Sequence, residues 1–260
     1  MLSDQQRQDA AQAVFKAERE CVAIPQLSKT YPDIELHDAY EIQRLWAELH
    51  EAEGARQIGH KIGLTSRAMQ KASNISEPDY GHLMSNMMYR DGDQIPASKF
   101  LKPRLEVELA FVMGEDLEGL GVQVHDVMRA TEFIQPALEI IDYRTEVPRA
   151  ITDTIADNAA SGGIIMGGRP VRPFDVDIRW VAGALAKNGV IEESGVSAAI
   201  MGHPAAGVAW LVNKLAGVGN KLEKGQLVLA GSFTRPVDIA AGDVISVEYG
   251  PLGNIGVAIV

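Results

Sequence analysis

Residues 103–114 have the sequence PRLEVELAFVMG, and this stretch decides the fold. Leucine and valine alternate with glutamate, which predicts a β-strand. Because successive side chains of a strand point to opposite faces, Glu106 and Glu108 lie on one face, about 7 Å apart. The leucines and the valine beside them take the other face. Alternation alone also fits a strand whose polar face is in water.

Two amphipathic helices are predicted before the strands begin. Residues 3–20 start after a possible N-cap, Ser3. Residues 36–54 have apolar side chains at helical spacing, with Asp38 as the expected N-cap and Gly54 at the end. We expect these helices to pack together at the N-terminus.

Short apolar runs separated by glycine and proline predict many strands in the rest of the chain. The remaining predicted elements are strands at 59–66 and 136–144, two strands joined by an Asn-Gly turn within 176–195, three strands in the C-terminal tail, helices at 124–134 and 203–219, a helical turn at 66–73 and a loop at 151–163. The mixture indicates an α+β fold with a β-rich core. We expect an N-terminal helical lobe, residues 1–57, and a catalytic domain, residues 58–260.

The charge balance excludes some classes of partner. Among 260 residues, 35 are acidic and 24 are basic, so the formal net charge is −11. Nucleic acids and anionic membranes are therefore not expected partners, since both need clustered Lys and Arg. Cys21 is the one cysteine, which indicates a reducing compartment. No apolar signal core or membrane span is visible, and we expect a cytoplasmic protein.

A third acid extends the glutamate pattern. Glu139 lies in PALEIIDYR, residues 136–144, between Leu138 and Ile140. Three acids in apolar surroundings would repel each other unless a cation lies among them. Carboxylate oxygens suit Mg²⁺ or Mn²⁺ better than zinc or copper. The pattern therefore predicts a metal site.

Other polar residues lie in apolar or glycine-rich segments. Lys61, inside GHKIGLTS, either extends to water or is held inside by acids. Asp79 is a loop acid that forms either a turn or part of a site. Ser161, Asn158 and Thr234 either stabilise turns or donate hydrogen bonds to a carboxylate. The sequence has neither a GxSxG elbow nor a P-loop.

Several sequence blocks occur in an order that covers nearly the whole chain. They are GHKIGLTS (59–66), EPDYG (77–81), PRLEVELAFV (103–112), PALEIID (136–142), ADNAASGG (156–163), GHPAAGVAWL (202–211) and LAGSFTRP (229–236). Together they resemble the hydratase/decarboxylase family of the meta-cleavage pathways that degrade aromatic compounds. The resemblance implies a fold like the C-terminal domain of fumarylacetoacetate hydrolase, and a homo-oligomer.

The resemblance also implies site residues. It implies Mg²⁺ or Mn²⁺ on Glu106, Glu108 and Glu139, and an active-site lysine and aspartate matching Lys61 and Asp79. The segments that hold Ser161 and Thr234 look like the family's contacts to the substrate carboxylate. The predicted substrate-binding set is Ser161, Thr234, Leu64, Asn158 and Arg235.

The implied reaction is the addition of water to a small 2-oxo-alkenoic acid or diacid, in homoprotocatechuate degradation. The block GSFTRP favours a seven-carbon diacid, and Arg235 would offer a cation for its second carboxylate. The alternative for Arg235 is an ion pair with a surface acid, with no role in binding the substrate. The alternatives are hydration of 2-hydroxypenta-2,4-dienoate, decarboxylation of 4-oxalocrotonate, hydrolysis of a carbon–carbon bond, and an inactive scaffold subunit.

Overall fold

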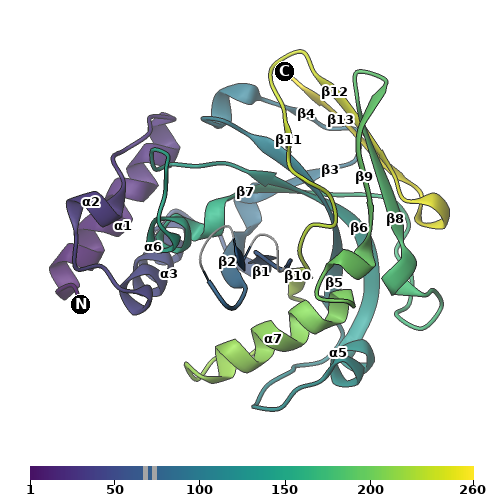
Figure 1. Ribbon diagram of the computed structural model, residues 1–260, viewed down its shortest axis with the longest axis horizontal. Coiled ribbons are helices and arrows are strands. Elements are labelled where there is room, and N and C mark those ends of the chain that lie inside the picture. Colours follow the sequence, from purple (N-terminus) through teal and green to yellow (C-terminus); the bar gives the residue numbers. More distant parts are fainter. Residues whose placement is uncertain (67–69, 72–74) are drawn as a thin grey trace.

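The structure of the protein is a computed structural model that describes residues 1–66, 70–71 and 75–260. Two sheets form its centre, and helices lie outside them (Figure 1). The first three helices stand together on one side, and the long helix near the C-terminus lies along another. An α+β fold with a β-rich core was predicted, and it is confirmed.

The larger sheet contains the strand that decides the fold. This strand, β5 (Arg104–Met113), is antiparallel to both of its neighbours, β10 (Leu227–Leu229) and β6 (Thr131–Ile141). The other strands are β1 (Gln57–Gly63), β2 (Asp79–Met84), β3 (Met88–Arg90), β7 (Ser161–Met166) and β11 (Val237–Asp238). Their order is β2-β1-β10-β5-β6-β7-β3, with β11 also beside β5.

The smaller sheet packs on the apolar face of β5. Its order is β4-β13-β12-β8-β9, with β4 (Gln94–Ile95), β8 (Ala182–Lys187), β9 (Val190–Val196), β12 (Val244–Glu248) and β13 (Asn254–Ile259). Leu105 and Val107 of β5 share one buried cluster with Ile245 and Val247 of β12. The apolar face of β5 is therefore core, which leaves its glutamates on the opposite side.

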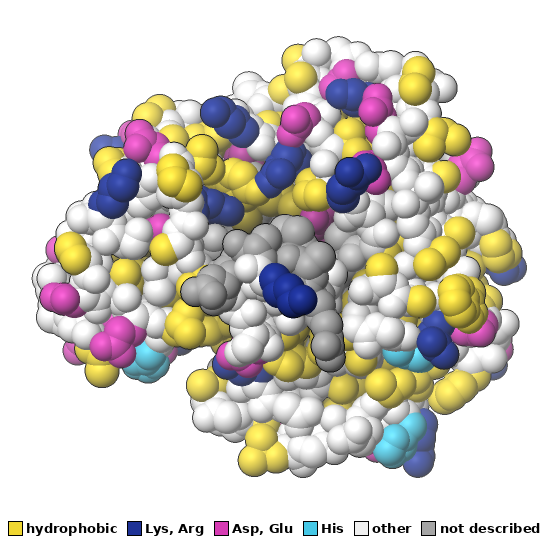
Figure 2. Space-filling model, viewed as in Figure 1, with side chains coloured by type: hydrophobic (Ala, Val, Ile, Leu, Met, Phe, Trp, Pro, Cys, Tyr) yellow, Lys and Arg dark blue, Asp and Glu magenta, His cyan; other side chains and the backbone are white. Residues whose placement is uncertain are grey.

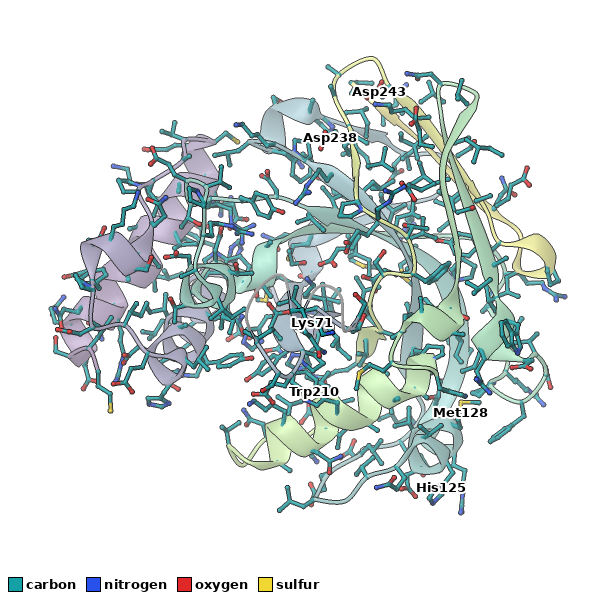
Figure 3. The ribbon with its side chains drawn as sticks, viewed as in Figure 1. Lys71, His125, Met128, Trp210, Asp238 and Asp243 are labelled. Carbon is teal, nitrogen blue, oxygen red and sulfur yellow. The ribbon has the colours of Figure 1, made fainter. Side chains whose placement is uncertain are left out.

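Helices cover the ends and one face of the larger sheet. They are α1 (Asp4–Glu20), α2 (Leu27–Thr30), α3 (Leu36–Ala52), α5 (Val124–Ala130), α6 (Ile151–Ala156) and α7 (Pro204–Ala216). Trp210 on α7 is directed toward the sheet, and its ring centroid lies 6.5 Å from that of Tyr80 on β2 (Figure 3). None of the described helices is long and apolar enough to span a membrane.

The two N-terminal caps differ in how well they were predicted. Ser3 caps α1 as expected, in a capping box with Gln6. Asp38 was expected to cap the second helix, and this was wrong, because the N-cap is Glu35. Asp38 lies one turn inside, where its carboxylate accepts the N–H groups of Glu35 at 3.0 Å and of Leu2 at 3.1 Å. It thus anchors the start of the chain to α3.

The N-terminal helices share a core with later segments. Trp46 of α3 belongs to one buried cluster with Met84, Met87 and Ile155. The side-chain amide of Gln43 donates to the carbonyl of Tyr80 at 2.9 Å and to that of Ile155 at 2.8 Å. These contacts hold α3 against β2 and α6. The division at residue 57 stays a prediction.

Two predicted boundaries were wrong. The helix expected at 124–134 ends at Ala130, because the following β-branched and aromatic residues join β6. Pro136 therefore lies inside β6 and does not open it. The expected loop at 151–163 contains α6, a 3₁₀ turn at Asn158–Ala160 and the start of β7. Burial of Ile155 stabilises α6 despite its small polar residues.

Other predicted elements agree with the structure. Asn188 and Gly189 have φ angles of 54° and 82° in the turn between β8 and β9. Helix α7 begins at Pro204, and the predicted strands before residue 66 and in the C-terminal tail are present. The helical turn expected at 66–73 lies mostly outside the described residues.

Candidate active site

Three glutamates meet near the centre of the larger sheet, on the face opposite the smaller sheet. Glu106 of β5 lies directly opposite Glu139 of β6, and Glu108 follows on the same face of β5. One carboxylate oxygen from each lies within 4.8 Å of the other two. Glu108 and Glu139 are fully buried and Glu106 is half-buried. The polar face of β5 therefore lines a buried acidic cluster and does not face bulk water.

Burial keeps these acids from ionising together. Burial, with the charge of Glu139, raises the pKa of Glu106 to about 8. Burial likewise raises the pKa of Glu108 well above its ordinary value. Burial raises the pKa of Glu139 too, while the charge of Lys61 acts to lower it. An uncompensated trio is electrostatically unfavourable.

The unpaired oxygens of the trio fit a hard divalent cation. Glu108 Oε2 accepts the Gly231 N–H at 2.9 Å, but Glu108 Oε1 and Glu139 Oε1 have no hydrogen-bond partner in the described part of the chain, and Glu139 Oε2 has only the ion pair with Lys61 at 3.4 Å. Buried carboxylate oxygens without donors are the ligands that Mg²⁺ and Mn²⁺ prefer. The three glutamates could therefore hold such an ion.

Lys61 lies beside this cluster. Its side chain on β1 is 4% exposed, and its Nζ is 3.4 Å from Glu139 Oε2 and donates to the Ala159 carbonyl at 2.9 Å. Burial alone would lower the pKa of Lys61, but the charges of Glu139, Asp79 and Glu106 outweigh burial and raise it. Lys61 is thus held inside by acids and does not extend to water.

Asp79 opens β2 opposite Gly63 of β1. Its side chain is 1% exposed, and Oδ1 has no hydrogen-bond partner among the residues described. A Cβ on Gly63 would lie 2.2 Å from Asp79 Oδ1 and 3.3 Å from Lys61 Nζ. Only glycine leaves room at position 63. Asp79 Oδ1 and Lys61 Nζ therefore both lie close to the same backbone position. Burial raises the pKa of Asp79, while the charges of Lys61 and Arg149 act to lower it.

Two predicted hydroxyl donors lie in segments that contact Glu139 and Glu108. Ser161 opens β7, and its side chain favours the ionised form of Glu139. Thr234 follows the segment whose Gly231 N–H binds Glu108. Ser161 Oγ and Thr234 Oγ1 are both buried; Thr234 Oγ1 has no hydrogen-bond partner within the described ranges, and Ser161 Oγ has no neighbour but Glu139 among the partners described. Both hydroxyls are available to a ligand.

The other three predicted substrate contacts lie differently. The amide of Asn158 is occupied by the backbone of His82, at 2.7 Å to its N–H and 2.9 Å to its carbonyl. Leu64 has a left-handed φ of 55°, and its side chain is half-buried. The Arg235 side chain is 84% exposed and pairs with Glu193 at 2.8 Å. Arg235 thus makes the surface pair that was the alternative, and all three substrate contacts stay predictions.

Two cationic residues near the site were not predicted. Arg104 shares a strand face with Glu106, and the alternation of β5 could have indicated it. Arg149 lies before α6, and no local pattern marks it. Both guanidinium groups lie over the ring of Tyr143.

Known proteins match this chain over most of their length. Residues 50–260 match the fumarylacetoacetate (FAA) hydrolase C-terminal family. The chain belongs to this family. It is 50% identical over 252 residues to the 2-oxo-hept-4-ene-1,7-dioate hydratase of Escherichia coli, covering 94% of each chain. It is 34% identical to the 2-keto-4-pentenoate hydratase of Paraburkholderia xenovorans, covering 98% of this chain and 95% of the relative.

A solved structure of this FAA hydrolase family has nearly the same fold. The 4-oxalocrotonate decarboxylase from Pseudomonas putida G7, complexed with magnesium and adipate, matches with a TM-score of 0.98 and 33% identity. The match covers 100% of this chain and 99% of the decarboxylase. Hydratases and decarboxylases thus share one scaffold, and the side chains of the site decide the reaction.

Proposed function

We propose that the chain is a metal-dependent hydro-lyase that adds water to 2-oxohept-4-ene-1,7-dioate and forms 4-hydroxy-2-oxoheptanedioate in aromatic-compound catabolism. The buried trio of Glu106, Glu108 and Glu139, with Lys61 and Asp79 beside it, carries the proposal. Higher identity with the seven-carbon hydratase than with the pentenoate hydratase or the decarboxylase supports hydration of the diacid.

The three glutamates would hold Mg²⁺ or Mn²⁺. When bound, such a cation supplies Lewis-acid polarisation at the keto-acid end of the substrate. The buried hydroxyls of Ser161 and Thr234 would donate hydrogen bonds to the carboxylate at carbon 1. These contacts orient the chain of the substrate past Lys61 and Asp79.

Lys61 and Asp79 divide the proton chemistry. The Lys61 ammonium, held protonated by the surrounding acids, would stabilise negative charge that develops on the oxygen at carbon 2. Asp79 would take a proton from carbon 3 and return it at carbon 5, which brings the double bond into conjugation with the ketone. Water then adds at carbon 4, and carbon 3 is protonated. A raised pKa makes the Asp79 carboxylate a stronger base for this transfer.

We further infer a homo-oligomer in the reducing cytoplasm. Cys21 is a free cysteine, and members of the family identified from the sequence blocks form oligomers. Light scattering on the purified protein should give a mass of at least twice the 28.1 kDa of one chain. A monomer at micromolar concentration would contradict the oligomer without affecting the reaction.

Turnover measurements test the reaction directly. With Mg²⁺, we expect the seven-carbon diacid to be hydrated with a higher kcat/KM than 2-hydroxypenta-2,4-dienoate, and 4-oxalocrotonate to release no CO₂. Chelation should abolish turnover, and Mg²⁺ should restore it. Full activity in chelator, or CO₂ release faster than hydration, would overturn the proposal.

A further inference from the structure

Arg104 and Arg149 converge on one aromatic ring beside the acidic cluster. The guanidinium carbon of Arg104 lies 5.0 Å from the ring centroid of Tyr143, and that of Arg149 lies 3.6 Å from it. Arg104 opens β5 and projects from the same strand face as Glu106 and Glu108. The ring therefore gathers two cations next to the glutamates.

The ion-pair partners of these two arginines are shared or absent among the described residues. Arg149 Nη1 is 3.6 Å from Asp157 Oδ2, but Asp157 also pairs with Arg144. Arg149 Nη1 is buried and has no hydrogen-bond partner in the described chain. The half-buried Arg104 has no ion pair within the described residues. Two guanidinium groups thus have unused donors.

Both arginines are within electrostatic reach of the proposed catalytic groups. Burial is the larger influence on Asp79 and Glu106, but the charge of Arg149 acts to lower the pKa of Asp79 and that of Arg104 acts to lower the pKa of Glu106. The side chain of Arg149 is 11% exposed. On the face shown in Figure 2, several Lys and Arg side chains lie near the centre, with Asp and Glu side chains beside some of them.

We propose that Arg104 and Arg149 bind the far carboxylate of a dicarboxylic substrate whose keto-acid end lies at Glu106, Glu108 and Glu139. This inference rests on the proposed function and names the second anchor of the same site. Arginine suits this role because its planar fork binds a carboxylate through two hydrogen bonds. A monocarboxylic substrate would leave both forks unused.

The spacing along β5 fits a seven-carbon chain. The Cα atoms of residues 104 and 106, two apart on one strand face, are separated by about 7 Å. Six carbon–carbon bonds of about 1.5 Å in a zigzag span roughly 7–8 Å. The length of such a diacid therefore matches the backbone spacing between Glu106 and Arg104. Arg235, which was predicted for this role, is highly exposed and already paired with Glu193.

Binding of two matched ligands isolates the far carboxylate. We would titrate Mg²⁺-loaded protein with 2-oxoheptanedioate and with 2-oxoheptanoate, which has a methyl group in place of the second carboxylate. Wild type should bind the diacid at least about 10-fold more tightly. In Arg104→Ala and Arg149→Ala, diacid affinity should fall about 10- to 100-fold while monoacid affinity changes less than about threefold.

Control variants separate recognition from folding. The exposed Arg172 offers the control Arg172→Ala, which should keep the preference for the diacid. If Arg149→Ala does not fold, Arg104→Ala and the charge-conserving Arg149→Lys still test the idea, and both should lose preference for the diacid. Equal loss of both ligands, unchanged preference, or loss of preference in Arg235→Ala instead would overturn the assignment.

The outcome is distinguishable from failure of the proposed reaction. If wild type prefers the diacid in binding but does not hydrate 2-oxohept-4-ene-1,7-dioate, the reaction is wrong and the assignment of the two arginines is supported. If wild type hydrates the diacid and the arginine variants retain its full kcat/KM, the arginine assignment alone is wrong.

Discussion

Glu106 and Glu139 lie directly opposite each other on the antiparallel strands β5 and β6. Like charges at directly opposed positions of a sheet destabilise it, and burial makes the repulsion stronger. The strand pairing therefore holds the two carboxylates together at a cost that a bound cation would offset. This relationship predicts opposite effects of one substitution on stability and on metal affinity.

Glu106→Gln should stabilise the metal-free protein and weaken metal binding. At pH 8.5 in chelator, we expect the free energy of unfolding to rise by up to about 1 kcal/mol, since one of two opposed charges is removed. Mg²⁺ affinity should fall at least about 10-fold. Urea unfolding and calorimetric titration measure the two effects. The exposed Glu248 offers the control Glu248→Gln, which should change neither quantity; a Glu106→Gln variant that bound Mg²⁺ normally would remove Glu106 from the ligand set.

The metal-free protein should lose stability as pH rises from 6.5 to 8.5. The folded-state pKa of Glu106 is raised from 4.5 to about 8, so its folded form keeps a proton that the unfolded chain has lost. The contribution of protonated Glu106 to the free energy of unfolding is fully present below pH 4.5. It is lost as pH rises through the folded-state pKa of about 8. Urea unfolding across this range should show the fall in wild type, a flatter profile in Glu106→Gln, and a flatter profile with saturating Mg²⁺.

Below pH 6.5, two buried histidines should make the stability of the protein change with pH in the opposite direction, so that stability falls as pH falls. Burial lowers the pKa of His60 to about 3 and that of His82 to about 4. Both imidazoles are therefore neutral when folded, and their contribution is lost as pH falls from 6.5 toward 4. Stability that kept rising from pH 6.5 to 8.5 in the absence of metal would contradict the raised pKa of Glu106.

Gly63→Ala should impair catalysis without unfolding the protein. The new methyl group would lie 2.2 Å from Asp79 Oδ1, so Asp79 must move. Displacement of a catalytic group by about 1 Å costs about 100-fold in rate, which kcat measurements would detect. Gly256→Ala is the matched control, because its nearest neighbour lies 3.7 Å away. If Gly63→Ala retained wild-type kcat, Asp79 would not need its present position.

Asp157→Asn should destabilise the fold strongly. Asp157 is fully buried, pairs with Arg144 and Arg149, and accepts the Arg144 backbone N–H at 2.8 Å. Loss of the charge leaves the buried Arg144 without its carboxylate partner, at a cost of about 3–5 kcal/mol in chemical unfolding. The exposed pair of Lys214 and Glu77 is the comparison, and Glu77→Gln should cost less than about 1 kcal/mol. Similar losses in the two variants would contradict a structural role for the buried pair.

Local patterns predicted the parts of the fold whose physics is local. The alternation around Glu106 and Glu108 predicted one face of a strand, and Ser3 predicted the start of a helix. Asp38 was misplaced by one turn, because this capping box has an acid at each end, Glu35 and Asp38. The helix α6 was missed because burial of Ile155 against distant residues stabilises it, and that burial is not visible in its own residues.

The amino-acid sequence by itself determined the strand pattern, the family resemblance and the identity of the acids, since these depend on periodicity and residue type along the chain. Only the tertiary structure decided that Glu139 opposes Glu106, that Arg235 lies in solvent and that Arg104 and Arg149 meet over Tyr143. The reason is that strand register and chain crossings bring together residues far apart in sequence, and the resulting burial sets their charges and their available partners.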